Sequence, residues 1–102
     1  MDTLYVSPIM IKSFADRRTE AFYRDGTCPK PWRHFEERAL VKLDMINHAA
    51  TLETLRVPPG NRLEKLKGDR KDQWSIRIND QYRVCFRWSG EDALDVEIVD
   101  YH

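Results

Sequence analysis

The residues best suited to chemistry lie in the C-terminal part of the chain, which ends in Asp100-Tyr101-His102. A histidine side chain titrates near neutral pH, so it can accept or donate a proton. Arg83 and Lys67 supply cations that can bind anionic oxygens. Asp100 can orient a base or take part in proton transfer, and Tyr101 offers a ring for stacking and a hydroxyl for a hydrogen bond. Together these residue types suit acid–base chemistry on an anionic substrate. The alternative is that His102 is only an exposed chain end, Asp100 a surface acid and Tyr101 a residue that caps the core.

Charge is balanced over the whole chain but unevenly distributed along it. The chain has 17 Lys and Arg and 17 Asp and Glu, so total charge does not indicate a polyanionic partner. Residues 62–88 nevertheless carry a net charge of +4, and residues 89–102 carry −5. A basic patch of this kind is typical of proteins that bind nucleic-acid phosphates. The alternative is ordinary solvated charge, partly neutralised by Asp95 and Glu97. Apart from Lys67 and Arg83, the basic residues concerned are Arg62, Lys65, Arg70, Lys71, Arg77 and Arg87.

The first half of the chain has helical periodicity. A short surface helix is predicted over Asp16–Tyr23, and it is broken by Gly26 and by Pro29 and Pro31. Apolar residues then recur at steps of three and four, which predicts one amphipathic helix of about four to five turns from Trp32 onward. Its apolar positions are Phe35, Ala39, Leu43, Ile46 and Ala50. A helical turn at Leu52–Leu55 and a loop at Pro58-Pro59-Gly60 follow.

The second half alternates apolar and polar residues, as half-buried strands do. The inward positions are predicted to be Trp74, Ile76, Ile78, Tyr82, Val84, Phe86, Trp88, Leu94, Val96 and Ile98. Turns are expected at Asn79-Asp80 and Ser89–Asp92, and short strands at Ile11–Phe14 and Arg62–Leu66. Helices followed by strands indicate an α+β fold, with the helices on one face of a mostly antiparallel twisted sheet. Arg77, Arg83 and Arg87 would then share the opposite face.

Length and composition indicate one domain. We expect it to span residues 10–102, with residues 1–9 as an extension of no assigned function. No apolar run is long enough for a transmembrane helix, which favours a cytoplasmic protein with no membrane partner. Cys28 and Cys85 lack a metal-ligand spacing, so we expect reduced packing residues, no metal and no cofactor.

Five short motifs follow one another along the chain: Met10-Ile11-Lys12-Ser13-Phe14, Arg62-Leu63-Glu64-Lys65-Leu66-Lys67-Gly68-Asp69-Arg70, Gln73-Trp74-Ser75-Ile76, Tyr82-Arg83-Val84-Cys85-Phe86 and Asp100-Tyr101-His102. In this order and combination they resemble the HigB toxins of the RelE/ParE superfamily. The resemblance implies a RelE-like fold and a toxin of a type II toxin–antitoxin pair that cleaves messenger RNA in the ribosomal A site. It implies as partners a HigA-type helix-turn-helix antitoxin, the ribosome with its message, and operator DNA bound only through the antitoxin complex.

The resemblance also implies a catalytic set. Cleavage by the adjacent 2′-hydroxyl needs a group that takes its proton, cations that stabilise charge on the phosphorane, and a donor for the departing 5′-oxygen. The matching residues are Glu64, Lys67, Arg83, Asp100, Tyr101 and His102. The remaining basic residues of the patch are expected to bind RNA.

Glu64 departs from the family pattern, because many HigB toxins have a histidine at this position. A carboxylate can act as a general base but is a poor general acid at neutral pH. Glu64 therefore either replaces the histidine as base, with His102 as acid, or only braces Arg83 or Arg62 and leaves a slow toxin. His34 and His48, on the helical half, are expected to be surface residues.

Two other functions fit the same fold. A ParE-like toxin would block DNA gyrase and would need no nuclease site, which the terminal Asp100-Tyr101-His102 argues against. A catalytically decayed toxin would be retained for antitoxin binding and operon autoregulation, and Glu64 keeps this alternative open.

Overall fold

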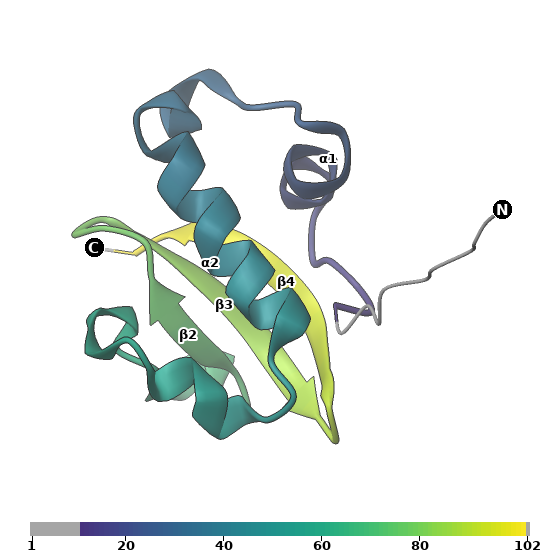
Figure 1. The fold of residues 1–102 in the computed structure, drawn as a ribbon, viewed down its shortest axis with the longest axis vertical. Helices are drawn as coiled ribbons and strands as arrows, with labels where there is room; N and C mark the ends of the chain where they lie inside the picture. The colour runs from purple at the N-terminus through teal and green to yellow at the C-terminus, as the bar shows by residue number, and fades with distance from the viewer. Residues whose placement is uncertain (1–10, 102) are drawn as a thin grey trace, which may run out of the picture.

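The computed structural model describes residues 11–101 and has two layers (Figure 1). Helices α1 (Arg17–Asp25) and α2 (Glu36–His48) lie on one face of a four-stranded sheet. Its strands pair in chain order, each antiparallel to the next: β1 (Glu64–Lys65), β2 (Trp74–Arg77), β3 (Tyr82–Ser89) and β4 (Asp92–Asp100). The predicted α+β architecture is therefore confirmed. The predicted extension, residues 1–9, and His102 lie outside the described residues.

Short 3-10 helices connect these elements. They are η1 (Lys30–Phe35), η2 (Leu52–Arg56), η3 (Pro59–Asn61) and η4 (Gly68–Arg70). The predicted turn after the long helix is confirmed by η2. None of the helices within residues 11–101 is long and apolar enough to cross a bilayer.

Helix α1 confirms the predicted short helix and has a definite cap at each end. The Asp16 carboxylate accepts a hydrogen bond from the Thr19 backbone N–H at 3.1 Å, and Gly26 ends the helix with a φ of +76°. Phe22 is fully buried and packs edge-to-face on Trp32, with ring centroids 5.5 Å apart. The sequence patterns missed Thr19, which is also fully buried.

The single long helix predicted from Trp32 is wrong at both ends. A 3-10 segment, Lys30–Phe35, occupies its first four residues, and α2 begins only at Glu36. The backbone becomes extended at Ala49, with a ψ of 121°, so the chain leaves helical geometry before Ala50. As a result Ala49 is buried, whereas Ala50, the predicted core residue, is exposed.

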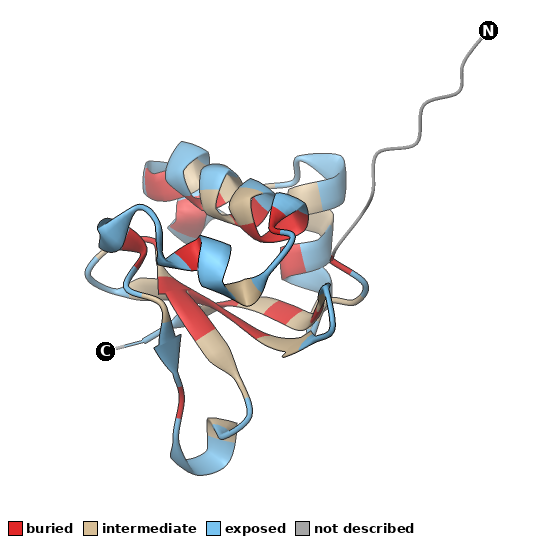
Figure 2. Cartoon of the chain, turned by 60° about the horizontal axis from the view of Figure 1, so that its bottom comes forward, coloured by how far each residue is buried: buried red, intermediate tan, exposed pale blue. Residues whose placement is uncertain are grey.

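The core lies between the helices and the sheet (Figure 2), and one predicted inward position is wrong. A bulge in β4 places Asp95 and Val96 opposite Phe86 alone, and Asp95 has a φ of +51°. The extra residue reverses the alternation, so Ala93 is fully buried in the core and Leu94, predicted to be inward, is not.

The chain segment before α1 covers the outer edge of β4. The predicted strand Ile11–Phe14 is reduced to two isolated parallel bridges, Ile11 with Ala93 and Phe14 with Val96. The Ser13 hydroxyl accepts a hydrogen bond from the Asp95 backbone N–H at 2.8 Å, which helps to hold the bulge. Further along the same edge, the Thr19 hydroxyl accepts from the Ile98 backbone N–H at 3.1 Å.

The Thr19 hydroxyl predicts a specific stability effect. Thr19→Val keeps the side-chain shape but leaves the buried Ile98 N–H without an acceptor, which should lower the free energy of unfolding by about 1–3 kcal/mol. Thr19→Ser keeps the hydroxyl and is the matched control. Urea unfolding of the three proteins is the measurement, and equal stability of the Val variant and the native protein would contradict the assignment.

Candidate active site

Arg83 is held on the outer face of the sheet by groups from several parts of the chain. Its Nη1 donates to the Ser75 hydroxyl of β2 at 2.7 Å and to the Arg62 carbonyl at 3.4 Å. The Glu64 carboxylate of β1 lies 3.6 Å from the same nitrogen, and the side chain of Arg83 is only 13% exposed. Its guanidinium carbon lies 5.9 Å from the centroid of the Tyr101 ring. The orientation of Arg83 is therefore fixed from several sides.

The catalytic residues predicted before β2 lie on β1 and on the loop that follows. Glu64 is half exposed, at 54% of its side-chain surface. Lys67 precedes η4 and is exposed, and its side chain makes no hydrogen bond or ion pair with any residue of the described chain. The structure thus brings Glu64 to Arg83, while Lys67 remains an exposed cation on the same segment.

The end of the described chain reaches the same region. The Tyr101 backbone N–H donates to the Gln81 carbonyl at 2.6 Å, and the Gln81 side-chain amide donates to the Asp100 carboxylate at 3.0 Å. A shallow hollow is lined by Arg70, Val99, Asp100 and Tyr101. Tyr101, at 39% exposure, is accessible from solvent. Of the predicted C-terminal residues, Tyr101 therefore lies beside Arg83, and Asp100 lines the adjoining hollow with it.

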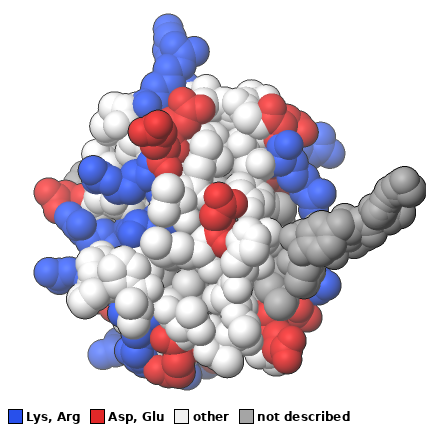
Figure 3. All heavy atoms as spheres, viewed as in Figure 1, with Lys and Arg blue, Asp and Glu red and all other residues white. Residues whose placement is uncertain are grey.

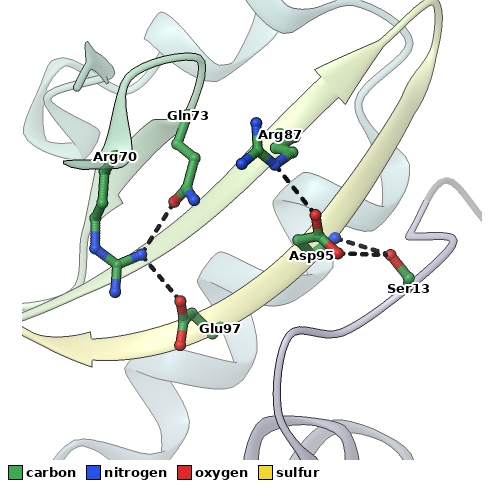
Figure 4. Close-up of polar contacts among 6 residues, drawn as sticks. All are labelled: Ser13, Arg70, Gln73, Arg87, Asp95 and Glu97. Atoms are coloured by element: carbon green, nitrogen blue, oxygen red, sulfur yellow. Dashed lines mark hydrogen bonds and ion pairs between the residues drawn. The ribbon is translucent and has the colours of Figure 1, made fainter. Parts of the chain in front are cut away.

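The acidic residues of β4 neutralise part of the basic patch (Figure 4). Arg70 donates to the Glu97 carboxylate at 2.9 Å and to the Gln73 side chain at 3.0 Å. The Glu97 hydrogen bond raises the pKa of Arg70, so this arginine stays charged. Arg87 donates to the Asp95 carboxylate at 3.2 Å. The alternative expectation, that Asp95 and Glu97 partly neutralise the patch, is therefore confirmed for these two arginines.

The other predicted RNA-binding residues lie nearer Arg83 and β1. Arg77 is the direct register partner of Arg83 and forms an ion pair with Asp80. The remaining three side chains are exposed and form no ion pair within residues 11–101: Arg62, Lys65 and Lys71. Lys65 lies over the Trp74 ring, 5.9 Å from its centroid.

The outer face also buries a small thiol and a hydroxyl beneath these charges. Ser75 and Cys85 are register partners on β2 and β3, and both are fully buried. Burial raises the pKa of the Cys85 thiol to about 11, so this thiol is neutral and is not a nucleophile. Among the described residues no three His, Cys, Asp or Glu side chains lie close enough to hold a metal ion. Sequence reasoning missed Ser75 as a site residue, although strand alternation had already placed it on the arginine face.

The sequence is similar to that of known toxins over nearly all of its length. The family described as RelE-like toxin of type II toxin–antitoxin system HigB matches residues 12–102. Toxin HigB-1 of Vibrio cholerae serotype O1 is 40% identical over 87 residues, which cover 84% of this chain and 92% of the relative. Endoribonuclease HigB of Proteus vulgaris is 29% identical over 93 residues, which cover 91% of this chain and all of the relative.

Solved structures of distant sequence share the fold. The YoeB–YefM complex from Staphylococcus aureus matches with a TM-score of 0.53 at 16% identity, covering 90% of this chain and 97% of the matched chain. The YoeB dimer from the same organism matches with a TM-score of 0.52 at 15% identity, covering 91% and 98%. These similarities confirm the predicted RelE-like fold. Since the family match also includes Arg83, Tyr101 and the other residues gathered around them, the chain belongs to the HigB family of RelE-like toxins of type II toxin–antitoxin systems.

Proposed function

We propose that this toxin is an endoribonuclease that cleaves messenger RNA on the ribosome, and hence in the cytoplasm. The observation that carries the proposal is the fixed position of Arg83 between the Ser75 hydroxyl and the Tyr101 ring, with Glu64 beside it. A guanidinium group held in this way can stabilise negative charge on a phosphate without reorganising during the reaction. Membership of the HigB family and the relative named Endoribonuclease HigB support the same activity.

The reaction proposed is attack by the ribose 2′-hydroxyl on the adjacent phosphate. A base takes the 2′-hydroxyl proton as the 2′-oxygen bonds to phosphorus. The bond from phosphorus to the 5′-oxygen then breaks, which leaves a 2′,3′-cyclic phosphate, and an acid protonates the departing oxygen. Arg83 and Lys67 stabilise the charge on the phosphorane. Tyr101 stacks on a nucleobase, because its ring is exposed beside the arginine.

The proton-transfer roles are assigned by chemistry and position. Glu64 serves as the base, since its carboxylate lies next to the phosphate-binding arginine and remains accessible to solvent. His102 serves as the acid, because its side chain is the terminal group able to donate a proton near neutral pH. Asp100 orients this end of the chain through its hydrogen bond with Gln81. The surrounding basic residues contribute binding of the RNA strand.

We further propose a HigA-type helix-turn-helix antitoxin as partner, with operator DNA bound through the toxin–antitoxin complex. Family membership supports an antitoxin partner, and the similar YoeB structure is of a complex with YefM. The toxin alone is proposed to bind neither DNA nor a membrane.

The first test is primer extension on messages translated in vitro, with and without ribosomes. Native protein should cut within codons only when ribosomes are present. Arg83→Gln should lower the cleavage rate about 10²–10³-fold, as loss of a preorganised charge-stabilising donor does. Removal of His102 should lower it comparably, through loss of the general acid.

Arg17→Gln is the matched control, because it removes the same charge from the exposed start of α1. It should cleave like the native protein. If Arg83→Gln cleaves as fast as this control, the proposed site is wrong. Inhibition of gyrase supercoiling by native protein would instead favour a ParE-like function, and overexpression without effect on growth or messages would favour a decayed toxin.

A second prediction separates the two roles open to Glu64. If its carboxylate is the base, Glu64→Gln should reduce the rate at saturating toxin about 10²–10⁴-fold while leaving ribosome binding intact. If Glu64 only braces Arg83, the same variant should change the rate by no more than a few fold. Single-turnover cleavage of ribosome-bound message at several toxin concentrations distinguishes these outcomes.

A further inference from the structure

Three arginines line a second hollow, which shares no lining residue with the hollow beside Tyr101. Arg62, Arg77 and Arg83 line it together with Gly60, Asn79 and Asp80. Arg62 is exposed and Arg77 keeps a third of its side-chain surface open, so solutes can reach both guanidinium groups. Basic side chains also gather at the left edge of Figure 3, where Figure 1 shows the turn between β2 and β3.

Two of these arginines are placed in an electrostatically unfavourable arrangement. Arg77 and Arg83 are direct cross-strand partners, and like charges in such positions destabilise a sheet. Burial lowers the pKa of Lys42 on α2, and the positive charges of Arg38 and Arg77 lower it further. Positive side chains therefore gather at this corner, where the exposed carboxylates of Asp80 and Glu64 balance Arg77 and Arg83 only in part, and a bound anion would lessen the remaining repulsion.

The third arginine stands on a rigid but strained backbone. Arg62 has a φ of +47°, a left-handed conformation that is unfavourable for a residue with a side chain. Its neighbour Asn61 is fully buried, donates to the Leu55 carbonyl at 3.1 Å and accepts from Lys42 at 2.5 Å. Arg62 is thus presented at the hollow by an anchored turn, and backbone strain of this kind is concentrated at binding sites.

We propose that this three-arginine hollow binds a second phosphate of the RNA strand, next to the phosphate that is cut. The inference rests on the proposed nuclease function and names a subsite for it. Arg83 lines the hollow, and its guanidinium carbon lies 5.9 Å from the Tyr101 ring centroid, so one guanidinium group adjoins both the hollow and the proposed position of the cut phosphate. That arrangement suits neighbouring groups along one strand. Arginine is suited to the task because its fork of donors can bind two phosphate oxygens at once.

Asp80 is the acidic residue that lines the hollow, and its carboxylate competes with the phosphate for Arg77. It lies at the tip of the β2–β3 turn, and its side chain is 98% exposed while paired with Arg77. A bound phosphate would take its place on Arg77. Removal of the Asp80 charge should therefore strengthen binding, an effect opposite in sign to removal of an arginine.

The test is an NMR titration with a 2′-O-methyl RNA trinucleotide, which cannot be cleaved by 2′-hydroxyl attack. The side-chain Nε–H signals of Arg62 and Arg77 report binding at the hollow. In two further probes one or the other internucleotide phosphate is replaced by a neutral methylphosphonate. We expect the replacement that falls on the phosphate in the hollow to weaken binding about five- to tenfold, as loss of one charge-assisted contact does.

The variants make the test specific. In Arg77→Gln and in Arg62→Gln, the same methylphosphonate should cause little further loss, and the slope of log affinity against log salt should fall by about 0.7. Asp80→Asn should bind the charged probe more tightly, and Arg17→Gln should match the native protein. Urea unfolding should show that Arg77→Gln is no less stable than native protein, since the substitution removes a repulsion.

The subsite proposal is overturned if the Arg62 and Arg77 signals do not move with the probe, or if Arg77→Gln binds like Arg17→Gln. It is also overturned if both methylphosphonates weaken native protein and Arg77→Gln equally. Because the probe cannot be cleaved, these results are independent of catalysis. A protein that binds the probe at the hollow but never cuts messages would refute the nuclease proposal, whereas one that cuts but leaves the hollow unoccupied would refute only the subsite.

Discussion

The site depends on the hydrogen bond from Arg83 to the buried hydroxyl of Ser75. A guanidinium group that is mostly withdrawn from water needs partners for its donors. Ser75, the Arg62 carbonyl, Glu64 and the Tyr101 ring provide them from four different segments. Arg83 on β3 thus contacts β1, β2, the turn before β1 and the residue that follows β4, and these segments together form one surface.

The acidic final strand determines where positive charge remains available. Glu97 and Asp95 bind Arg70 and Arg87 across the outer face of the sheet, so the middle of that face is nearly neutral. Within the described residues, cations without an ion-pair partner are left around β1, at Arg62, Lys65 and Lys67, whereas Arg77 beside the β2–β3 turn pairs with the exposed Asp80 of that turn. A chain with no net charge can therefore still present a local binding surface for phosphates, because opposite charges are paired in one region and left apart in another.

Periodicity was sufficient to predict the elements that depend on local sequence. The strands, the capped helix α1 and the outward direction of the arginines all follow from spacing and capping residues. The errors arose where distant contacts decide the outcome. Ser13 helps to hold the bulge in β4, and because of this bulge Ala93 is buried where Leu94 was predicted to be. The residue pattern within β4 does not show that a bulge forms there. The contact between Ser75 and Arg83 likewise requires the register of two strands, which turn residues indicate only approximately.

The pairing of residues 11–15 with β4 joins the beginning and the end of the described chain. These bridges connect segments more than 80 positions apart, so they form only after nearly the whole sequence is available. The same strand carries Tyr101 to Arg83. During synthesis, then, the sheet edge stays open and the arginine lacks its aromatic neighbour until β4 has emerged from the exit tunnel. Completion of the sheet edge and completion of the surroundings of Arg83 are therefore the same late event.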